Sequence, residues 1–154
     1  MYQEYLGVNL AYDTDGVRTT NASQRTQGYY HFDMDELEKL VGEKLTVSFE
    51  IKSPDGSGGY ARALFVSSGY SGLGGIRFEP YPITNDWVYH THTFVYTQDT
   101  HDRLKNSPGI PMVGLKSNNV VVGNDGRRYP LSLRRFQLEL GDEPSEYSNN
   151  LNNK

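Results

Sequence analysis

The segment Lys44–Lys52 constrains the fold more than any other part of the chain, because its apolar residues recur at every second position. Leu45, Val47, Phe49 and Ile51 alternate there with polar residues. Successive side chains of a β-strand point to opposite faces, so this alternation places the four apolar side chains together on one face. The pattern predicts a strand that buries one face in a core and presents a polar face to water.

Other segments with strand character follow, and turn-rich stretches such as residues 53–59 and 124–126 separate them. The further predicted strands are Tyr60–Val66, Gly75–Phe78, Trp87–Tyr96, Pro111–Leu115, Val120–Val122 and Leu131–Leu140. Many short strands punctuated by glycine and proline are typical of an antiparallel sandwich or barrel. The sequence therefore predicts an all-β fold.

One short helix is predicted just before the Lys44–Lys52 strand. Asp33 and Glu36 have the spacing of a capping box, and Gly42 supplies a stop signal. The apolar residues between them share one helix face: Leu37, Leu40 and Val41. So short a helix is not stable alone in water, so we expect it to pack across an open end of the sandwich.

The last predicted strand changes its phase. Its apolar residues are first at odd and then at even positions: Leu131 and Leu133, then Phe136, Leu138 and Leu140. The switch falls at Arg134 and Arg135, where an extra residue in one strand would turn the following side chains to the other face. We therefore predict a β-bulge at this pair.

Composition narrows the class of protein further. The chain has 154 residues, no cysteine and a formal net charge of −4. The missing cysteines exclude a disulfide framework, an iron–sulfur cluster, a thiolate zinc site and a cysteine nucleophile. The acidic balance argues against nucleic acid as a partner, and no apolar run is long enough to span a membrane. Residues 1–148 are predicted to form one domain, and the polar, asparagine-rich residues 149–154 a disordered tail.

The order of these features has a counterpart in a known group of domains. A short helix runs into an alternating strand, a later strand carries Trp87 and Phe94, and the last strand ends Leu-Glu-Leu-Gly at Leu138–Gly141, followed by Ser-Glu-Tyr-Ser at Ser145–Ser148. Together they resemble the carbohydrate-binding-module-like jelly rolls of phage tail, baseplate and fibre proteins. The resemblance implies an all-β antiparallel β-sandwich of jelly-roll type, similar to galactose-binding and carbohydrate-binding modules, with one short helix.

Catalysis is not favoured by any pattern in the chain. There is no nucleophile elbow, no zinc-protease helix and no phosphate-binding loop, and no pair of carboxylates can be placed at a glycosidase separation. His90 and His92 have the spacing of two metal ligands on one strand face. We interpret them instead as two histidines on a polar face, because no third ligand follows. The chain is therefore expected not to be an enzyme and to hold no catalytic metal.

A structural calcium ion is a separate possibility that the resemblance raises. Members of this group often hold one with carboxylate and carbonyl oxygens, and Asp13 and Asp15 near the first strand could contribute. These two residues by themselves do not define a site, so no cofactor is predicted from them.

Sugar binding is the function that the composition favours. Sugars present C–H faces to aromatic rings and hydroxyl groups to planar polar groups, and tyrosine offers a large contact area at low entropic cost. The predicted carbohydrate-binding residues are Tyr60, Arg62, Tyr70, Tyr81 and Tyr89. Other candidates have structural interpretations: Trp87 as core or rim packing, and Tyr147 as packing at the exit of the last strand. The Arg127–Arg128 and Arg134–Arg135 pairs would suit an acidic partner, but we interpret them as a solvated turn and a strand face.

The leading hypothesis is a non-catalytic phage virion domain that recognises a host cell-surface glycan. The alternative is a structural decoration or assembly domain that contacts other virion proteins without binding sugar. Interfaces between proteins also favour tyrosine and arginine, so composition does not separate these two hypotheses. Small virion domains often form trimers, so a homotrimer is an assembly state to test. Both hypotheses place the chain in the virion.

Overall fold

The structure is a computed structural model that describes residues 5–19, 29–52, 60–67, 70–71, 81–82, 84–107, 109–116 and 131–148. Within this part, only the backbone is described for residues 60–64, 66–67, 70–71, 81–82 and 116. The predicted strands Gly75–Phe78 and Val120–Val122 and the predicted tail at residues 149–154 lie outside the described residues.

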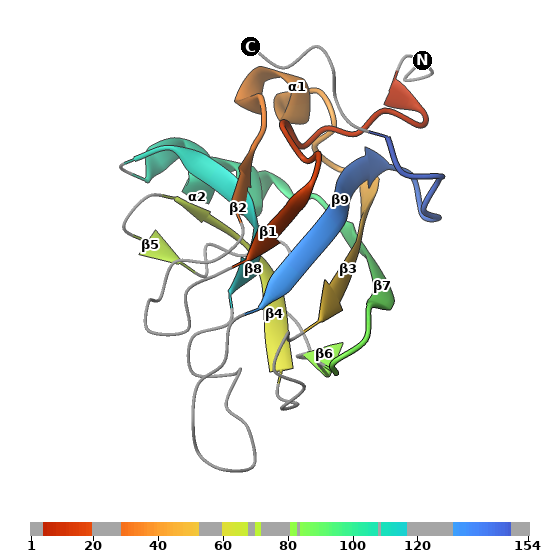
Figure 1. Cartoon of the computed structure of the whole chain (residues 1–154). Coiled ribbons are helices and arrows are strands. Elements are labelled where there is room, and N and C mark those ends of the chain that lie inside the picture. The colour runs from red at the N-terminus through yellow and green to blue at the C-terminus, as the bar shows by residue number, and fades with distance from the viewer. Residues whose placement is uncertain are drawn as a thin grey trace.

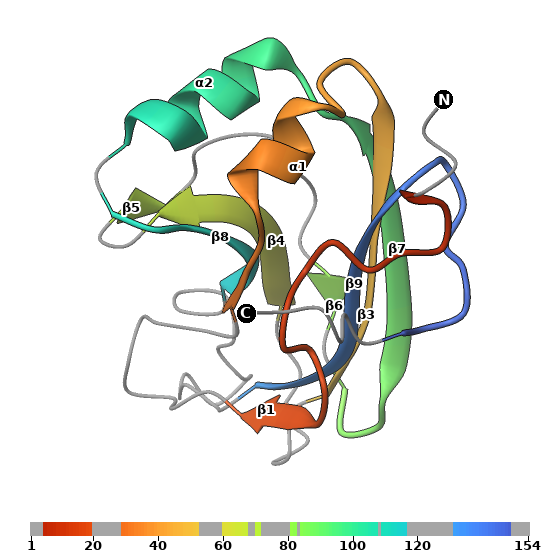
Figure 2. The same cartoon turned by 90° about the horizontal axis from the view of Figure 1, so that it is seen from above.

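Two antiparallel sheets face each other across the core (Figures 1 and 2). The first has the strand order β1-β9-β3-β7 and is built from β1 (Val17–Thr19), β9 (Ser132–Leu140), β3 (Lys44–Lys52) and β7 (Val88–Val95). The second has the order β2-β8-β4-β5, and β6 also pairs with β4. Its strands are β2 (Tyr29–His31), β8 (Pro111–Lys116), β4 (Tyr60–Ser67), β5 (Tyr70–Ser71) and β6 (Tyr81–Pro82). The predicted antiparallel β-sandwich is confirmed.

The alternating segment Lys44–Lys52 forms β3 with the predicted bounds. Its four apolar side chains are all fully buried, as the alternation requires. Of the other predicted strands, the structure contains Tyr60–Val66, Trp87–Tyr96, Pro111–Leu115 and Leu131–Leu140, with ends shifted by one residue or less. The short strands β1, β2, β5 and β6 were not predicted, because two or three residues show no periodicity.

The predicted helix is α1 (Met34–Glu38), and Asp33 caps it by accepting a hydrogen bond from the Asp35 amide at 2.8 Å. The Glu36 carboxylate accepts from the Tyr12 hydroxyl at 2.9 Å, a tertiary contact that the capping-box interpretation did not contain. Leu37 and Leu40 are both fully buried. Gly42, which follows them, has a φ of +94°. The helix thus covers one end of the sandwich, as expected.

The prediction of one helix is corrected by a second one, α2 (Gln98–Asn106). It lies beside α1 at the same end of the sandwich (Figure 2), and His101 joins the two helices. The ring of His101 is bonded to the buried Tyr96 hydroxyl at 2.8 Å and lies 3.6 Å from the Glu38 carboxylate. Neither helix, nor any other in the described residues, is long and apolar enough to span a membrane.

Aromatic rings from both sheets meet in the core. Phe136 of the first sheet stacks on Tyr30 of the second, with ring centroids 4.8 Å apart, and also lies 6.1 Å from the ring of Phe49. Phe65 and Phe94 make an edge-to-face pair at 5.9 Å across the sheets. Such contacts bury a large apolar area and fix the sheets face to face. Burial raises the pKa of Tyr30 to about 12.

The predicted bulge in the last strand is confirmed. Ser48 pairs with Gln137 and Glu50 with Arg134, so two residues of β9 lie opposite the single residue Phe49 of β3. Arg135 is the extra residue and has a φ of +54°, a left-handed conformation that costs a non-glycine residue about 1–2 kcal/mol. The bulge keeps Phe136 in the core after the change of phase.

The C-terminal segment 141–148 crosses the outer side of the first sheet and is hydrogen-bonded to side chains that β9 presents there. Glu139 and Gln137, both buried, make hydrogen bonds to Ser145 and Ser148. Gly141, with a φ of +115°, makes the turn into this segment. The two C-terminal motifs of the sequence resemblance, at residues 138–141 and 145–148, therefore form a clasp between the last strand and the C-terminal segment.

Candidate functional site

A row of four residues crosses the water-facing side of the first sheet, one from each strand. Arg134 pairs with Val17 of β1 on one side and with Glu50 of β3 on the other, and Glu50 in turn pairs with Tyr89 of β7. Residues that lie directly opposite each other in neighbouring strands point to the same face. We call Val17, Arg134, Glu50 and Tyr89 the cross-strand row. Three strand spacings of about 4.8 Å give it a length of about 14 Å.

Both ends of the cross-strand row are exposed and its centre is charged. Val17 is 56% and Tyr89 53% exposed, which is high for an apolar and an aromatic side chain. Between them, the Arg134 Nε lies 2.7 Å from one oxygen of the Glu50 carboxylate, whose side chain is only 17% exposed. A half-desolvated ion pair of this kind holds both groups in a fixed orientation.

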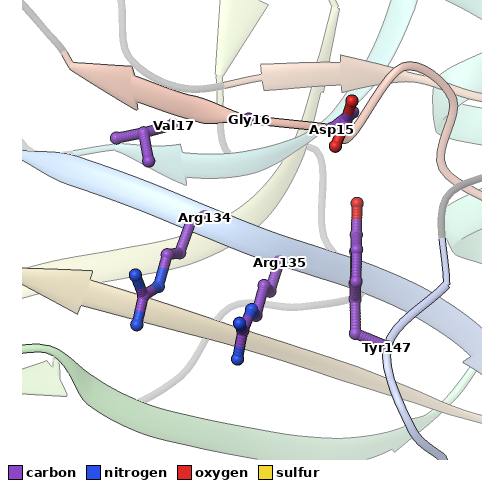
Figure 3. A pocket seen from close by; sticks show the side chains of 6 residues that line it. All are labelled: Asp15, Gly16, Val17, Arg134, Arg135 and Tyr147. Atoms are coloured by element: carbon purple, nitrogen blue, oxygen red, sulfur yellow. The ribbon is translucent and has the colours of Figure 1, made fainter.

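The bulge adds a second arginine to the same face. Consecutive residues of a regular strand point to opposite faces, but Arg134 and Arg135 both extend from β9 toward β3 (Figure 3). The Arg135 Nη1 lies 3.4 Å from the second oxygen of Glu50, and its side chain is 57% exposed. One carboxylate therefore faces two guanidinium groups, one of them largely in water.

Trp87 is half-buried beside the cross-strand row, immediately before β7. The Arg134 guanidinium carbon lies 4.1 Å from the centroid of its ring, and the Lys52 amine 5.1 Å. Cations at these distances are attracted by the negative face of the indole. The predicted interpretation of Trp87 as rim packing agrees with these contacts, because the ring orders the two cations at the edge of the sheet.

A hollow of about 330 Å³ lies at the β1 end of the cross-strand row (Figure 3). Its lining residues come from the β1 turn, the bulge and the C-terminal segment: Asp15, Gly16, Val17, Arg134, Arg135 and Tyr147. The Tyr147 hydroxyl is held by the Thr14 hydroxyl at 2.8 Å. Tyr147 therefore packs at the exit of the last strand, as interpreted from the sequence, and also forms one wall of this hollow.

The predicted carbohydrate-binding residues lie on both sheets. Tyr60 and Arg62 are on β4, and their positions have the opposite parity to the buried Phe65. Tyr81 is in register with Ala61 and Tyr70 with Ser67, so the backbone brings these four residues to one strand and its two short partners. The sequence placed Tyr70 and Tyr81 in or beside loops, whereas the structure has them in β5 and β6. Tyr89 lies apart from this group, on the first sheet.

His90 and His92 do not lie on a polar face, which corrects that interpretation. His90 pairs with Phe49 and His92 with Val47, both fully buried, so the two histidines occupy the inner side of edge strand β7. The ring of His92 is nearly parallel to that of Phe94, with centroids 6.5 Å apart. The error arose because two histidines between threonines look polar, although their parity is that of Phe94.

The position of His92 predicts a pH-dependent stability. Burial lowers the pKa of His92 below its usual value of about 6.5. The unfolded chain therefore binds a proton at a higher pH than the folded one, so this contribution to stability is complete above about pH 6.5 and is lost as the pH falls toward the folded pKa. We expect His92→Gln to flatten the loss of stability between about pH 7.5 and about pH 5 in urea unfolding. His31→Gln, at an exposed position, is the control; an unchanged slope in His92→Gln would contradict the assignment.

Across the described segments, no group of three histidine, cysteine, aspartate or glutamate side chains is close enough to hold a metal ion. Asp15 lines the hollow, and the main-chain carbonyl of Asp13 accepts a hydrogen bond from Arg18 at 2.8 Å. In the described structure, Asp13 and Asp15 therefore do not belong to a cluster of three such side chains.

Sequence reasoning missed Glu50 and Val17, and it interpreted the Arg134–Arg135 pair as a solvated strand face. Glu50 was counted only as one member of a polar strand face, and Val17 belongs to a strand of three residues. The signal that could have found the arginines was the change of phase at Arg134 and Arg135, because a bulge there brings two neighbouring side chains to one face. The pairing partners of the bulge were not available from the pattern.

No family model and no curated protein matches the chain. Among solved structures, it is similar to the CBM22-1 xylan-binding domain of Paenibacillus barcinonensis Xyn10C, with a TM-score of 0.45, 17% identity and coverage of 84% of this chain and 85% of that one. It is also similar to a CBM4 module, with a TM-score of 0.48, 9% identity and coverage of 88% and 81%. A third is the BppUct-A-L tripod from the baseplate of bacteriophage Tuc2009, with a TM-score of 0.47, 13% identity and coverage of 94% and 59%. All three are likenesses in fold at low sequence identity.

Proposed function

We propose that this chain is a non-catalytic domain of a phage virion, of tail, baseplate or fibre type, and that it binds a host surface carbohydrate on the cross-strand row. The observation that carries the proposal is the exposed ring of Tyr89 in line with the Glu50–Arg134 ion pair. An aromatic face takes the C–H side of a sugar, while carboxylate and guanidinium groups exchange hydrogen bonds with its hydroxyls.

The geometry of the row suits an extended ligand. Its members are spread over four strands and about 14 Å, which is a contact line for several sugar units rather than a pocket for one. The groups are also pre-oriented, because strands hold Tyr89 and Val17 and the ion pair fixes Glu50 and Arg134. Rigid elements lower the entropic cost of binding. The placement in a virion is supported by the sequence resemblance, whose two C-terminal motifs form the clasp.

The alternative remains an assembly domain that contacts other virion proteins. The exposed apolar side chains on the first sheet favour it, because Val17, Tyr89 and Val95 are each about half exposed on its outer side. A protein interface of standard size would cover the whole row and bury about 800 Å² on each partner. The two functions therefore compete for the same surface, and a binding experiment separates them.

Tyr89→Ala is expected to weaken glycan binding at least about tenfold, because the variant removes the stacking surface while its exposed position leaves the fold intact. The measurement is calorimetric titration of the purified chain with surface polysaccharide extracted from host cells. Val95→Ala, another exposed residue of β7, is the matched control. Two double variants, Tyr60→Ala/Arg62→Ala and Tyr70→Ala/Tyr81→Ala, test the second sheet.

Three results have distinct meanings. Loss of glycan binding in Tyr89→Ala alone supports the cross-strand row as the binding site. Loss in a double variant alone keeps the carbohydrate function but moves it to β4 and its short partners. No binding by the wild type to any host envelope polysaccharide contradicts the proposed function, and a stable trimer that protects Tyr89 would then favour assembly.

A further inference from the structure

The face that carries the cross-strand row holds an arginine whose charge is not neutralised by its surroundings. We propose that the ligand is an acidic saccharide, a polyhydroxylated chain bearing carboxylate or phosphate groups, and that Arg135 binds its anionic group. This inference rests on the proposed function and names the class of ligand for the same site.

The β-bulge brings Arg135 to the same face as Arg134. A regular strand would send Arg135 to the opposite face from Arg134, toward the core. The chain instead adopts a φ of +54° at an arginine, a conformation that glycine or asparagine tolerates far better. Backbone strain of this kind persists where the surrounding structure enforces it and clusters at functional sites, as β-bulges do. Here the bulge returns Phe136 to the core and also places a pair of guanidinium groups on one face.

The charged groups around the site do not balance. Arg134, Arg135 and Lys52 lie around the site, against the carboxylates of Glu50 and Asp15, so one positive charge is left over. This local excess stands out in a chain whose formal net charge is −4. A negative net charge gives the protein as a whole no attraction for polyanions. An anion held here must be held by local contacts.

The Arg135 guanidinium is exposed and less closely paired than that of Arg134. Arg134 is committed to Glu50 at 2.7 Å and covers the Trp87 ring. Arg135 meets Glu50 through one nitrogen at 3.4 Å and is 57% exposed, so most of its five N–H donors face water beside the hollow. A planar guanidinium binds carboxylate and phosphate groups through two parallel hydrogen bonds. The donor set therefore fits either anion.

The walls of the hollow complete the site. Tyr147 and Val17 offer apolar surface, and the Asp15 carboxylate can accept hydrogen bonds from hydroxyl groups. A neutral alkyl or aromatic ligand would leave Asp15 and Arg135 without partners, whereas an acidic sugar satisfies both. The hollow lies at the β1 end of the row, so a chain that stacks on Tyr89 can place an acidic unit beside Arg135.

The test compares three soluble polymers of similar length on the purified chain: hyaluronan oligosaccharides, which carry carboxylates, poly(glycerol phosphate), and neutral dextran. We expect one or both acidic polymers to bind at least about tenfold more tightly than dextran. This preference should fall as salt rises from about 0.05 to about 0.5 M, because exposed charges are screened. The stronger of the two acidic polymers identifies carboxylate or phosphate as the source of the anion.

Arg135→Gln is expected to reduce the affinity for the preferred acidic polymer about tenfold. Arg103→Gln is the matched control, since Arg103 is equally exposed at 58% and paired with Asp99 at 3.0 Å, but lies on α2. Arg135→Gly separates binding from folding: glycine relieves the strained φ, so this variant should unfold at the same or a higher urea concentration and still lose the acidic ligand.

Opposite results overturn the inference in recognisable ways. Equal affinity for dextran and the acidic polymers, or acidic binding unchanged in Arg135→Gln, removes the acidic class while leaving carbohydrate recognition in place. Failure of every polymer together with host polysaccharide removes the proposed function itself. Binding to an acidic virion protein through Arg135, with no saccharide bound, assigns the charge to assembly.

Discussion

Glu139→Ala is expected to lower the free energy of unfolding by about 2–3 kcal/mol and to release the C-terminal segment from the first sheet. Glu139 is 1% exposed, and its carboxylate is the centre of the clasp. It accepts hydrogen bonds from the Ser145 hydroxyl at 2.6 Å, from the Ser145 amide at 3.1 Å and from the Gln137 side-chain amide at 2.6 Å. Alanine removes this acceptor from the Ser145 amide and hydroxyl, and leaves the Gln137 amide only its longer contacts with Ser145 at 3.3 Å.

The size of this effect follows from the asymmetry of hydrogen bonding. A satisfied hydrogen bond contributes about 1 kcal/mol, but a buried donor that loses its partner costs about 1–3 kcal/mol. The loss spreads along the segment because Gln137 in turn accepts from the Ser148 amide at 2.9 Å. Glu139→Gln keeps the shape of the side chain but turns one acceptor into a donor that faces Gln137. We therefore expect an intermediate loss for it.

The measurement is urea unfolding combined with hydrogen exchange of residues 141–148. Glu146→Ala is the matched control, because Glu146 belongs to the same segment but is exposed. It should change stability by less than about 0.5 kcal/mol. A fall of under about 1 kcal/mol in Glu139→Ala, with exchange unchanged, would show that other contacts hold the segment.

The parts of the fold that sequence predicted are those where one physical rule acts alone. Strand β3 alternates without interruption, and burial of one face follows directly. The change of phase in β9 predicted a bulge for the same reason, since only an extra residue returns Phe136 to the core. Helix α2 escaped prediction because its buried residues are Thr100, His101 and Leu104, of which one is apolar. Its Thr97 cap was the remaining signal, with a hydroxyl that accepts from the Thr100 amide.

The candidate site was less predictable because it depends on register between strands far apart in sequence. Parity assigns a face to each residue, but it does not say that Val17 pairs with Arg134 or Glu50 with Tyr89. Tyr89 was predicted as a contact for its residue type, without its neighbours. The same limit explains His92, whose parity was recognised while the burial of its face was not. Composition indicates what a surface contains, and register decides which groups meet.

Asn9→Ala is expected to cost about 3–4 kcal/mol, the largest loss predicted for this chain. Its side chain is 1% exposed and acts as a short length of missing strand beside β9. The amide nitrogen donates to the Phe136 carbonyl at 2.9 Å, and the amide oxygen accepts from the Leu138 amide at 3.1 Å. A neighbouring strand would make this same pair of bonds, but β1 pairs with β9 only at residues 132–134.

Asn9 also ties the two ends of the domain together. Its nitrogen donates to the Ser148 carbonyl at 2.8 Å, at the end of the clasp, and its oxygen accepts from the Ala11 amide at 3.0 Å. Alanine at this position leaves donors and acceptors of three separate segments without their partner at once. Since Asn9 and Glu139 both hold the segment 141–148, at Ser148 and Ser145, the double variant should cost less than the two single losses together.

Urea unfolding of Asn9→Ala and Asn9→Asp distinguishes a hydrogen-bonding role of the Asn9 side chain from a role in packing alone. Aspartate has nearly the same volume and keeps the acceptor oxygen, but it replaces the donor with an oxygen that faces two carbonyl groups. A packing role predicts a small effect for Asn9→Asp, whereas the hydrogen-bonding role predicts a loss at least as large as that of alanine. Asn106→Ala, at an exposed asparagine at the end of α2, is the control and should unfold as the wild type does. If Asn9→Asp also unfolds as the wild type does, the side chain only fills space, and β9 must hold its edge by other means.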